Sequence, residues 1–137
     1  KIYIHTEKLQ FEAPTKKDEV YVLFLPENEI HELGLLYLNY QLALHGYKTI
    51  YLGQTMPIES LEDLLKYYHN IRFVSYFTVV PTKDDIDDYF EKFGEVLKKS
   101  PDSKLWVLGH QIQEIDEDRA KGPIKIFKTI NQLIESL

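Results

Sequence analysis

Apolar runs alternate with amphipathic stretches along most of the chain. Runs rich in apolar residues predict strands at 20–25, 49–52, 72–77, 104–108 and 124–127. The first run reads Val-Tyr-Val-Leu-Phe-Leu, which is typical of a strand that is covered on both faces. Because amphipathic stretches alternate with these runs along most of the chain, the pattern predicts five βα units whose strands lie parallel.

The amphipathic stretches predict helices at 30–44, 57–68, 82–99 and 129–137. Gly46 follows the first of these stretches and ends its helix, and Pro57 opens the second helix. Thr82, with Asp85 three residues later, resembles a capping box and predicts the start of the third helix.

Right-handed crossovers between parallel strands restrict how five such units can close. They predict a three-layer α/β/α fold with a five-stranded parallel sheet of order 2-1-3-4-5, which is flavodoxin-like. In this architecture ligands bind at the carboxyl ends of the strands, near the point where the strand order reverses. The loops that follow the predicted strands are therefore where functional residues are expected.

Composition narrows the class of protein. The chain has 137 residues, with 16 basic and 22 acidic ones, so its formal charge is −6. The absence of cysteine excludes disulfides, thiolate metal sites and a cysteine nucleophile. The acidic balance argues against a nucleic-acid surface on these residues, and no apolar run approaches the ~18 residues of a membrane span. We expect one soluble, cytoplasmic domain over 19–137, with 1–18 as a linker or the remnant of an upstream region.

Several common chemistries are absent from the loops. No Gly-x-Gly-x-x-Gly follows the first strand, and no phosphate loop of the Gly-x-x-x-x-Gly-Lys-Ser/Thr type occurs. The third strand ends in Ser75-Tyr76-Phe77, where a phospho-receiver would carry an aspartate. His31 begins a stretch like that of a zinc-protease helix, but Leu35 stands where the second histidine is required, so zinc is not expected.

The first loop keeps one chemically suggestive group, Glu29-x-His31-x-x-Gly34. A histidine at a helix start meets the positive end of the helix dipole, which keeps a lone pair available for a metal. Glu29 can accept a hydrogen bond from the other ring nitrogen and so fix the tautomer. Gly34 removes a side chain where a flat, bulky group could approach the helix. The alternative is that His31 is a capping or solvent-facing histidine.

These residues resemble a known signature. Glu29-x-His31-x-x-Gly34, Ser75-x-Phe77 and Gly109 are similar to the Asp-x-His-x-x-Gly, Ser-x-Leu and Gly-Gly motifs of cobalamin-binding Rossmann-like domains. The stretch 25–57 looks closest to the carboxyl-terminal sensor domain of MerR-type regulators. That group includes light-responsive cobalamin-dependent repressors, in which Glu opens the motif.

The resemblance implies roles for these residues toward adenosylcobalamin or methylcobalamin. His31 would bind cobalt from below and displace the dimethylbenzimidazole, whose nucleotide tail would pass between the sheet and its helices. Glu29 would support His31, Ser75 would line the tail pocket, and Gly109 would let the tail pass close to the backbone.

Four further positions complete the expected site. Gly53 and Thr55 would contact the edge of the corrin ring. Phe77 stands where the family has a small aliphatic residue and would narrow the tail pocket. His110 replaces the second glycine of the Gly-Gly pair.

The function implied is that of a non-enzymatic sensor. Cobalamin binding would change the oligomeric state of a homo-oligomer, and DNA would be bound by a helix-turn-helix upstream of this domain. No membrane partner is expected. A corrinoid carrier domain of a methyltransferase or mutase is one alternative. A degenerate domain that serves dimerisation without cobalamin is the other.

Overall fold

The computed structural model describes residues 16–137, which form one five-stranded parallel sheet of order β2-β1-β3-β4-β5. The predicted fold class and strand order are confirmed. The strands are β1 (Lys16–Pro26), β2 (Tyr47–Met56), β3 (Ile71–Tyr76), β4 (Lys104–Leu108) and β5 (Ile124–Ile126). The helices are α2 (Leu33–Leu44), α3 (Ile58–Glu62), α4 (Ile86–Leu97) and α5 (Ile130–Glu135). Short 3-10 turns are η1 (Asp63–Lys66), η2 (His110–Ile112) and η3 (Glu117–Arg119).

The expected boundary at residue 19 falls inside β1, which begins at Lys16. The linker or remnant expected over 1–18 falls mostly on residues 1–15 and so outside the described residues.

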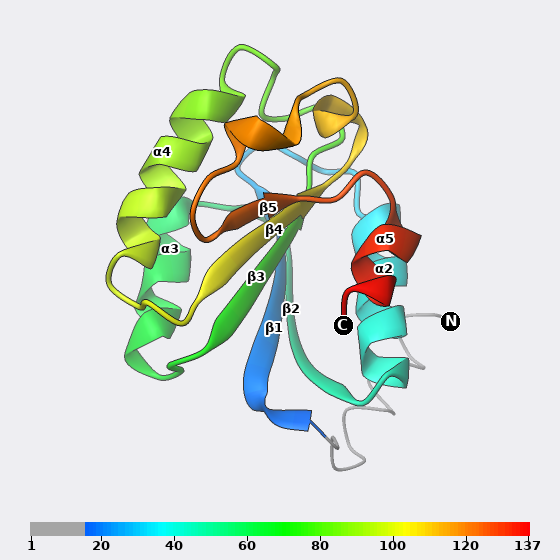
Figure 1. Cartoon of the computed structure of the whole chain (residues 1–137), viewed down its shortest axis with the longest axis vertical. Helices are drawn as coiled ribbons and strands as arrows, with labels where there is room; N and C mark the ends of the chain where they lie inside the picture. The colour runs from blue at the N-terminus through cyan, green and yellow to red at the C-terminus, as the bar shows by residue number, and fades with distance from the viewer. Residues whose placement is uncertain (1–15) are drawn as a thin grey trace.

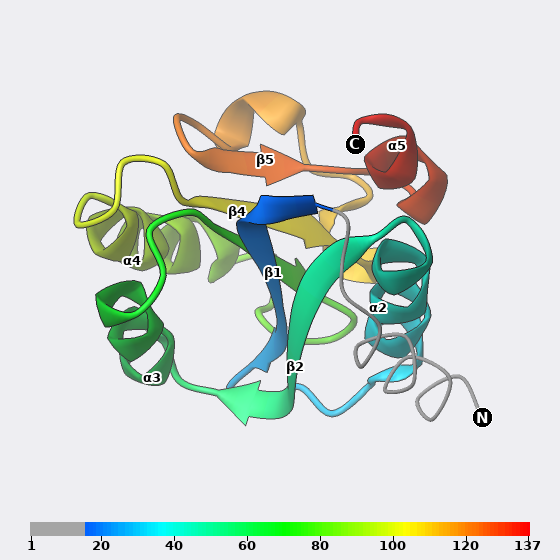
Figure 2. The same ribbon diagram turned by 90° about the horizontal axis from the view of Figure 1, so that it is seen from below.

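Helices cover both faces of the sheet, with α2 and α5 on one face and α3 and α4 on the other (Figure 1). Figure 2 shows the same division from below. Within β1, Tyr21 and Leu23 belong to the core under α2 and α5, whereas Val22 and Phe24 belong to the core on the opposite face. This alternation explains the unbroken apolar run, because each side of the strand meets a layer of helices. No helix within 16–137 is long and apolar enough to cross a membrane.

The first helix begins later than its sequence pattern predicted. The expected start was residue 30, but α2 begins at Leu33. The side chain of Glu29 accepts hydrogen bonds from the backbone N–H groups of Ile30 and His31, at 2.9 and 3.1 Å, and so holds them in a loop. His31 therefore lies in the approach to the helix and not in its first turn.

The third helix is also shorter than predicted. It was expected over 82–99, but α4 begins at Ile86. The Thr82 hydroxyl donates to the Asp85 carboxylate over 3.0 Å, and the Asp85 N–H donates to the Thr82 carbonyl over 2.9 Å. The capping-box prediction is wrong because these contacts close a separate turn before the helix, and the Asp85 carboxylate caps no N–H group of α4.

Candidate functional site

The loop after β1 lies at the carboxyl edge of the sheet, at the point where the strand order reverses. It opens with a turn in which the N–H of Glu29 donates to the carbonyl of Pro26 over 3.0 Å. Asn28 adopts a left-handed conformation in this turn, with φ 74°, which asparagine tolerates better than most residues. The turn directs the Glu29 side chain beneath the neighbouring loop.

One oxygen of the Glu29 carboxylate joins the loop after β1 to the loop after β3. Its Oε1 accepts hydrogen bonds from the N–H groups of Thr78, Val79 and Val80, at 3.0, 2.6 and 3.0 Å. Three consecutive N–H groups that converge on one oxygen form a concave anion site made by the backbone. Glu29 is only 1% exposed, so it fixes the two loops from inside the protein.

The other oxygen, Oε2, positions His31. It accepts hydrogen bonds from the backbone N–H groups of Ile30 and His31, and it lies 2.8 Å from Nδ1 of His31. Burial by itself would raise the pKa of Glu29, but the hydrogen bonds from Val79, Val80 and His31 outweigh burial and lower the pKa to about 2. The carboxylate is therefore ionised at neutral pH.

The ionised carboxylate determines which nitrogen of His31 carries a proton. A carboxylate accepts hydrogen bonds and donates none, so the hydrogen between Glu29 and Nδ1 belongs to the imidazole. In the neutral ring Nε2 is then left with an unshared electron pair. The side chain is 55% exposed, and among residues 16–137 Nε2 has no hydrogen-bond partner. The expected Glu29–His31 hydrogen bond is confirmed, and it leaves an oriented nitrogen ligand facing solvent.

Large apolar side chains are exposed on the His31 loop, at the start of α2 and on the neighbouring loop after β3. Ile30 is 60% exposed, Leu33 is 77% exposed and Val79 is 49% exposed. Exposed apolar residues of this kind favour contact with a partly apolar ligand or partner when they come together near a binding group. We call Ile30, Leu33 and Val79 the apolar rim.

Gly34 lies against an aromatic side chain of the protein itself. A Cβ atom at this position would lie 2.7 Å from Cζ of Tyr76, which is closer than real Cβ atoms come to any neighbour. The missing side chain therefore accommodates the Tyr76 ring. The sequence predicted the need for a flat neighbour but did not identify Tyr76.

The motif residues of β3 face inward. Ser75 is fully buried, and its hydroxyl donates to the carbonyl of Phe24 over 2.9 Å. Phe77 is also fully buried, and its ring meets that of Tyr89 edge to face, with 5.3 Å between the ring centres.

The motif residues after β4 complete the packing around Phe77. Gly109 has φ 116°, and a Cβ atom there would clash with the carbonyl oxygen of Phe77. This position therefore requires glycine for a close contact between two backbones. The next residue, His110, is exposed at the start of η2.

The carboxyl end of β2, which was predicted as a loop from Gly53 onward, is tied to the start of α2 by Glu32. The Tyr51 hydroxyl donates to Oε1 of Glu32 over 2.7 Å, and the same oxygen would lie 3.2 Å from a Cβ atom at Gly53. Gly53 and Thr55 both have positive φ, 78° and 50°. They lie in the last turn-like part of β2, where its register with β1 is irregular, and Thr55 is exposed there. The sequence pattern did not identify Glu32, because its role depends on a residue of the neighbouring strand.

The structure thus brings together Glu29 and His31, and it ties the end of β2, which carries Gly53 and Thr55, to Glu32 beside His31 in the chain. Ser75, Phe77 and Gly109 make contacts within the protein, and their roles toward a cofactor stay predictions, as does that of His110.

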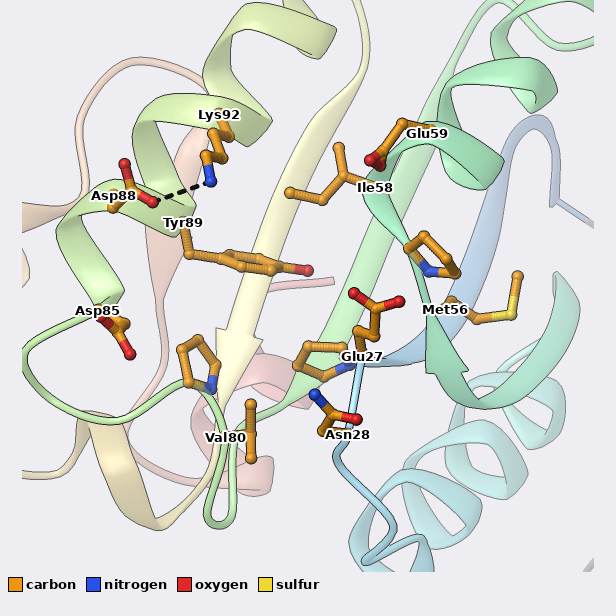
Figure 3. Close-up of a pocket in the computed structure, with 13 residues that line it drawn as sticks. Glu27, Asn28, Met56, Ile58, Glu59, Val80, Asp85, Asp88, Tyr89 and Lys92 are labelled. Atoms are coloured by element: carbon orange, nitrogen blue, oxygen red, sulfur yellow. Dashed lines mark ion pairs between the residues drawn. The ribbon is translucent and has the colours of Figure 1, made fainter.

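A cavity of about 250 Å³ opens at the same edge of the sheet, on the side of α3 and α4 (Figure 3). Its lining includes Asn28 from the first loop, Ile58 from α3 and Tyr89 from α4. Sequence reasoning missed it, because its walls come from four separate segments of the chain.

The fold is similar to that of solved corrinoid proteins, although no protein-family model and no curated protein matches the chain. The monomethylamine corrinoid protein of Methanosarcina barkeri aligns with a TM-score of 0.73 and 13% identity, over 97% of this chain and 62% of its own. A cobalamin-binding protein from Desulfitobacterium hafniense DCB-2 aligns with a TM-score of 0.65 and 18% identity, over 98% and 67%.

The methanol:cobalamin methyltransferase complex MtaBC from Methanosarcina barkeri contains a chain that aligns with a TM-score of 0.67 and 14% identity. That alignment covers 93% of this chain and 48% of the other. The chain therefore shares the fold of cobalamin-binding domains and spans about half to two thirds of the proteins compared.

Proposed function

We propose that this domain binds a corrinoid and that Nε2 of His31 is the lower axial ligand of its cobalt. The observation that carries the proposal is the 2.8 Å hydrogen bond between Glu29 and Nδ1 of His31, which leaves Nε2 unprotonated in the neutral ring of a side chain that is 55% exposed. A neutral imidazole with a carboxylate on its other nitrogen is a strong donor for a transition metal. The bound corrinoid would supply a cobalt centre able to carry a methyl or adenosyl group.

The surroundings of His31 support this proposal. A corrin ring is a wide, flat group whose faces are partly apolar, and the apolar rim lies on the His31 loop, at the start of α2 and on the loop after β3. The likeness in fold to three solved corrinoid proteins adds to this argument.

The residues present fit a role of His31 as a ligand of cobalt, but they leave no room for a nucleotide base beside Gly34. The resemblance of the motifs implies that the nucleotide tail passes near this glycine, yet the Tyr76 ring fills the space there. The hydroxyl of Ser75 already donates to a backbone carbonyl. We therefore limit the proposal to cobalt ligation by His31, with Glu29 as the residue that orients it.

At a finer level we propose a sensor domain of a MerR-type regulator, without catalytic activity of its own. The stretch 25–57, which looks closest to such sensors, supports this role. DNA binding and a ligand-dependent oligomeric state would then belong to the full regulator.

A corrinoid carrier for methyl transfer is the second candidate. Two of the structures compared favour it, since one is a monomethylamine corrinoid protein and another is a methanol:cobalamin methyltransferase complex. In that case a separate methyltransferase would use the bound corrinoid.

Titration with hydroxocobalamin, followed by absorbance, tests the axial ligand. We expect saturable binding with the spectral change that accompanies replacement of the dimethylbenzimidazole by a histidine. His31→Ala should abolish that change. His69→Ala is the matched control, because His69 is also exposed but precedes β3 at the opposite edge of the sheet. An unchanged spectrum with the unsubstituted protein, or an equal change with His31→Ala, would overturn the proposal.

Sedimentation velocity with adenosylcobalamin or methylcobalamin separates the two finer roles. A sensor should change its oligomeric state when the ligand binds. An unchanged state with bound ligand would contradict the sensor and favour the carrier.

A further inference from the structure

The cavity between α3 and α4 contains a buried hydroxyl that has no partner. Tyr89 extends from α4 into the cavity, and its hydroxyl points toward the gap between Ile58 and Glu27 (Figure 3). The hydroxyl oxygen is buried, and no hydrogen-bond partner for it occurs within the described part of the chain. Burial raises the pKa of Tyr89, so the group stays a neutral hydroxyl that can donate and accept. A buried hydroxyl without a partner destabilises a folded protein unless a bound molecule pairs with it.

The mouth of the cavity is acidic. Four exposed carboxylates belong to its lining, those of Glu27, Glu59, Asp85 and Asp88. Asp88 forms an ion pair with Lys92 over 3.1 Å. Among the side chains that the structure describes (19–137), no lysine, arginine or histidine forms an ion pair with the other three. The opening therefore presents excess negative charge, which favours a cation.

The carboxylates do not form a metal site. Within 16–137 no three acidic, histidine or cysteine side chains lie close enough to hold a metal ion. Negative charge distributed around an opening suits an organic cation, which contacts the separate carboxylates at the mouth of the cavity. Between this mouth and the Tyr89 hydroxyl the cavity wall is largely apolar, with Met56, Ile58 and Pro81 among its residues.

We propose that this cavity binds a small organic ammonium ion that also carries a hydroxyl group, of the amino alcohol class. The ammonium group lies among the carboxylates at the mouth of the cavity, the methylene groups lie along the apolar wall, and the oxygen of the ligand forms a hydrogen bond with the Tyr89 hydroxyl. At about 250 Å³ the cavity is smaller than the ~300–1,000 Å³ of sites for drug-sized ligands, so it suits a molecule of a few heavy atoms. This site is separate from His31 and does not depend on corrinoid binding.

The test is an NMR titration of the protein, without corrinoid, with 4-amino-1-butanol. We expect saturable shifts of the backbone amides of Ile58, Glu59 and Tyr89, with millimolar affinity, as the small size of the probe implies. Three related probes each lack one feature. Butylammonium has no oxygen for Tyr89, 1-butanol has no charge, and 4-hydroxybutyrate has the opposite charge.

The variant Tyr89→Phe isolates the hydroxyl. The unsubstituted protein should bind 4-amino-1-butanol about 3- to 10-fold more tightly than butylammonium, as one additional hydrogen bond provides. In Tyr89→Phe the two affinities should become equal. Glu59→Gln should weaken both ammonium probes and leave 1-butanol unaffected.

Three outcomes would overturn the proposal. They are the absence of saturable shifts, equal binding of 4-hydroxybutyrate, and an undiminished preference for 4-amino-1-butanol in Tyr89→Phe. Because no corrinoid is present, a failure here leaves the proposed function untouched, and the hydroxocobalamin titration leaves this proposal untouched.

Discussion

The buried polar groups on the two sides of the carboxyl edge of the sheet differ in whether they have hydrogen-bond partners within the protein. On the side of α2, the Glu29 carboxylate has hydrogen bonds on both oxygens, and the space beside Gly34 is filled by the Tyr76 ring. On the side of α3 and α4 a cavity remains open, and the buried Tyr89 hydroxyl has no partner within 16–137.

The difference separates two uses of a buried polar group. Glu29 is fully paired by the protein, so it holds loops and the His31 ring in place before any ligand arrives. The unpaired hydroxyl of Tyr89 stabilises nothing in the described structure and gains its hydrogen bond only from a ligand. A buried polar group whose hydrogen bonds are all made within the protein therefore holds other residues in place. A buried polar group without a partner favours a ligand that can supply the missing hydrogen bond.

The substitution Glu29→Gln should have the largest effect on this comparison. A neutral amide accepts the converging N–H groups more weakly than a carboxylate does, and its NH₂ group faces donors. Since the pKa is lowered from 4.5 to about 2, the charged group stabilises the fold by about 3 kcal/mol at neutral pH. Urea unfolding at pH 7 should show a loss of this order.

The stabilisation by the Glu29 charge should depend on pH in a defined direction. A carboxyl group with a lowered pKa stabilises the folded state above its unfolded pKa, and the stabilisation is lost as pH falls from about 4.5 to about 2. The difference between the unsubstituted protein and Glu29→Gln should therefore shrink over this range. Glu59→Gln is the control, because an exposed glutamate should change stability by less than about 0.5 kcal/mol. A constant difference at all pH values would contradict the role given to the Glu29 charge.

The substitution Gly34→Ala should cause the next largest loss of stability. Its Cβ would lie 2.7 Å from the Tyr76 ring, and overpacking of this kind costs about 1–3 kcal/mol. The double variant Gly34→Ala/Tyr76→Ala removes the clash, so thermal unfolding should show strong coupling between the two sites.

Gly94→Ala is the matched control for Gly34→Ala. Gly94 lies within α4, and a Cβ atom there would meet no atom within 4 Å. Alanine should stabilise this helix by about 0.5–1 kcal/mol. Equal effects at the two glycines would mean that Tyr76 is not the reason for Gly34.

The substitution Tyr89→Phe should have the smallest effect on stability. Because no partner loses a hydrogen bond, the free energy of unfolding should stay within about 0.5 kcal/mol or rise slightly. Tyr51→Phe is the comparison, since the Tyr51 hydroxyl donates to Glu32 over 2.7 Å, and its loss should cost about 0.5–1.5 kcal/mol. A larger loss for Tyr89→Phe than for Tyr51→Phe would show that the Tyr89 hydroxyl already has a partner.

Local pattern was sufficient for the strands and for one pair of site residues. The apolar run at 20–25 predicted the central strand, because alternate residues of β1 are buried under helices on opposite faces. Glu29 and His31 are two residues apart, so their hydrogen bond could be predicted from spacing alone. The start of α2 was predicted three residues too early, because apolar periodicity does not reveal that a side chain has captured the N–H groups of Ile30 and His31.

The sequence by itself determined the order of strands and helices, the parallel sheet, and the presence of an imidazole with a carboxylate neighbour. Only the tertiary structure decided that Glu29 also binds three N–H groups some 50 residues further along the chain, and that Tyr76 fills the space at Gly34. It also decided that Tyr89 lines a cavity and that its buried hydroxyl has no partner among the described residues. The physical reason is range: periodicity and turn chemistry act between near neighbours, whereas pairing and packing of buried groups depend on segments that only the fold brings together.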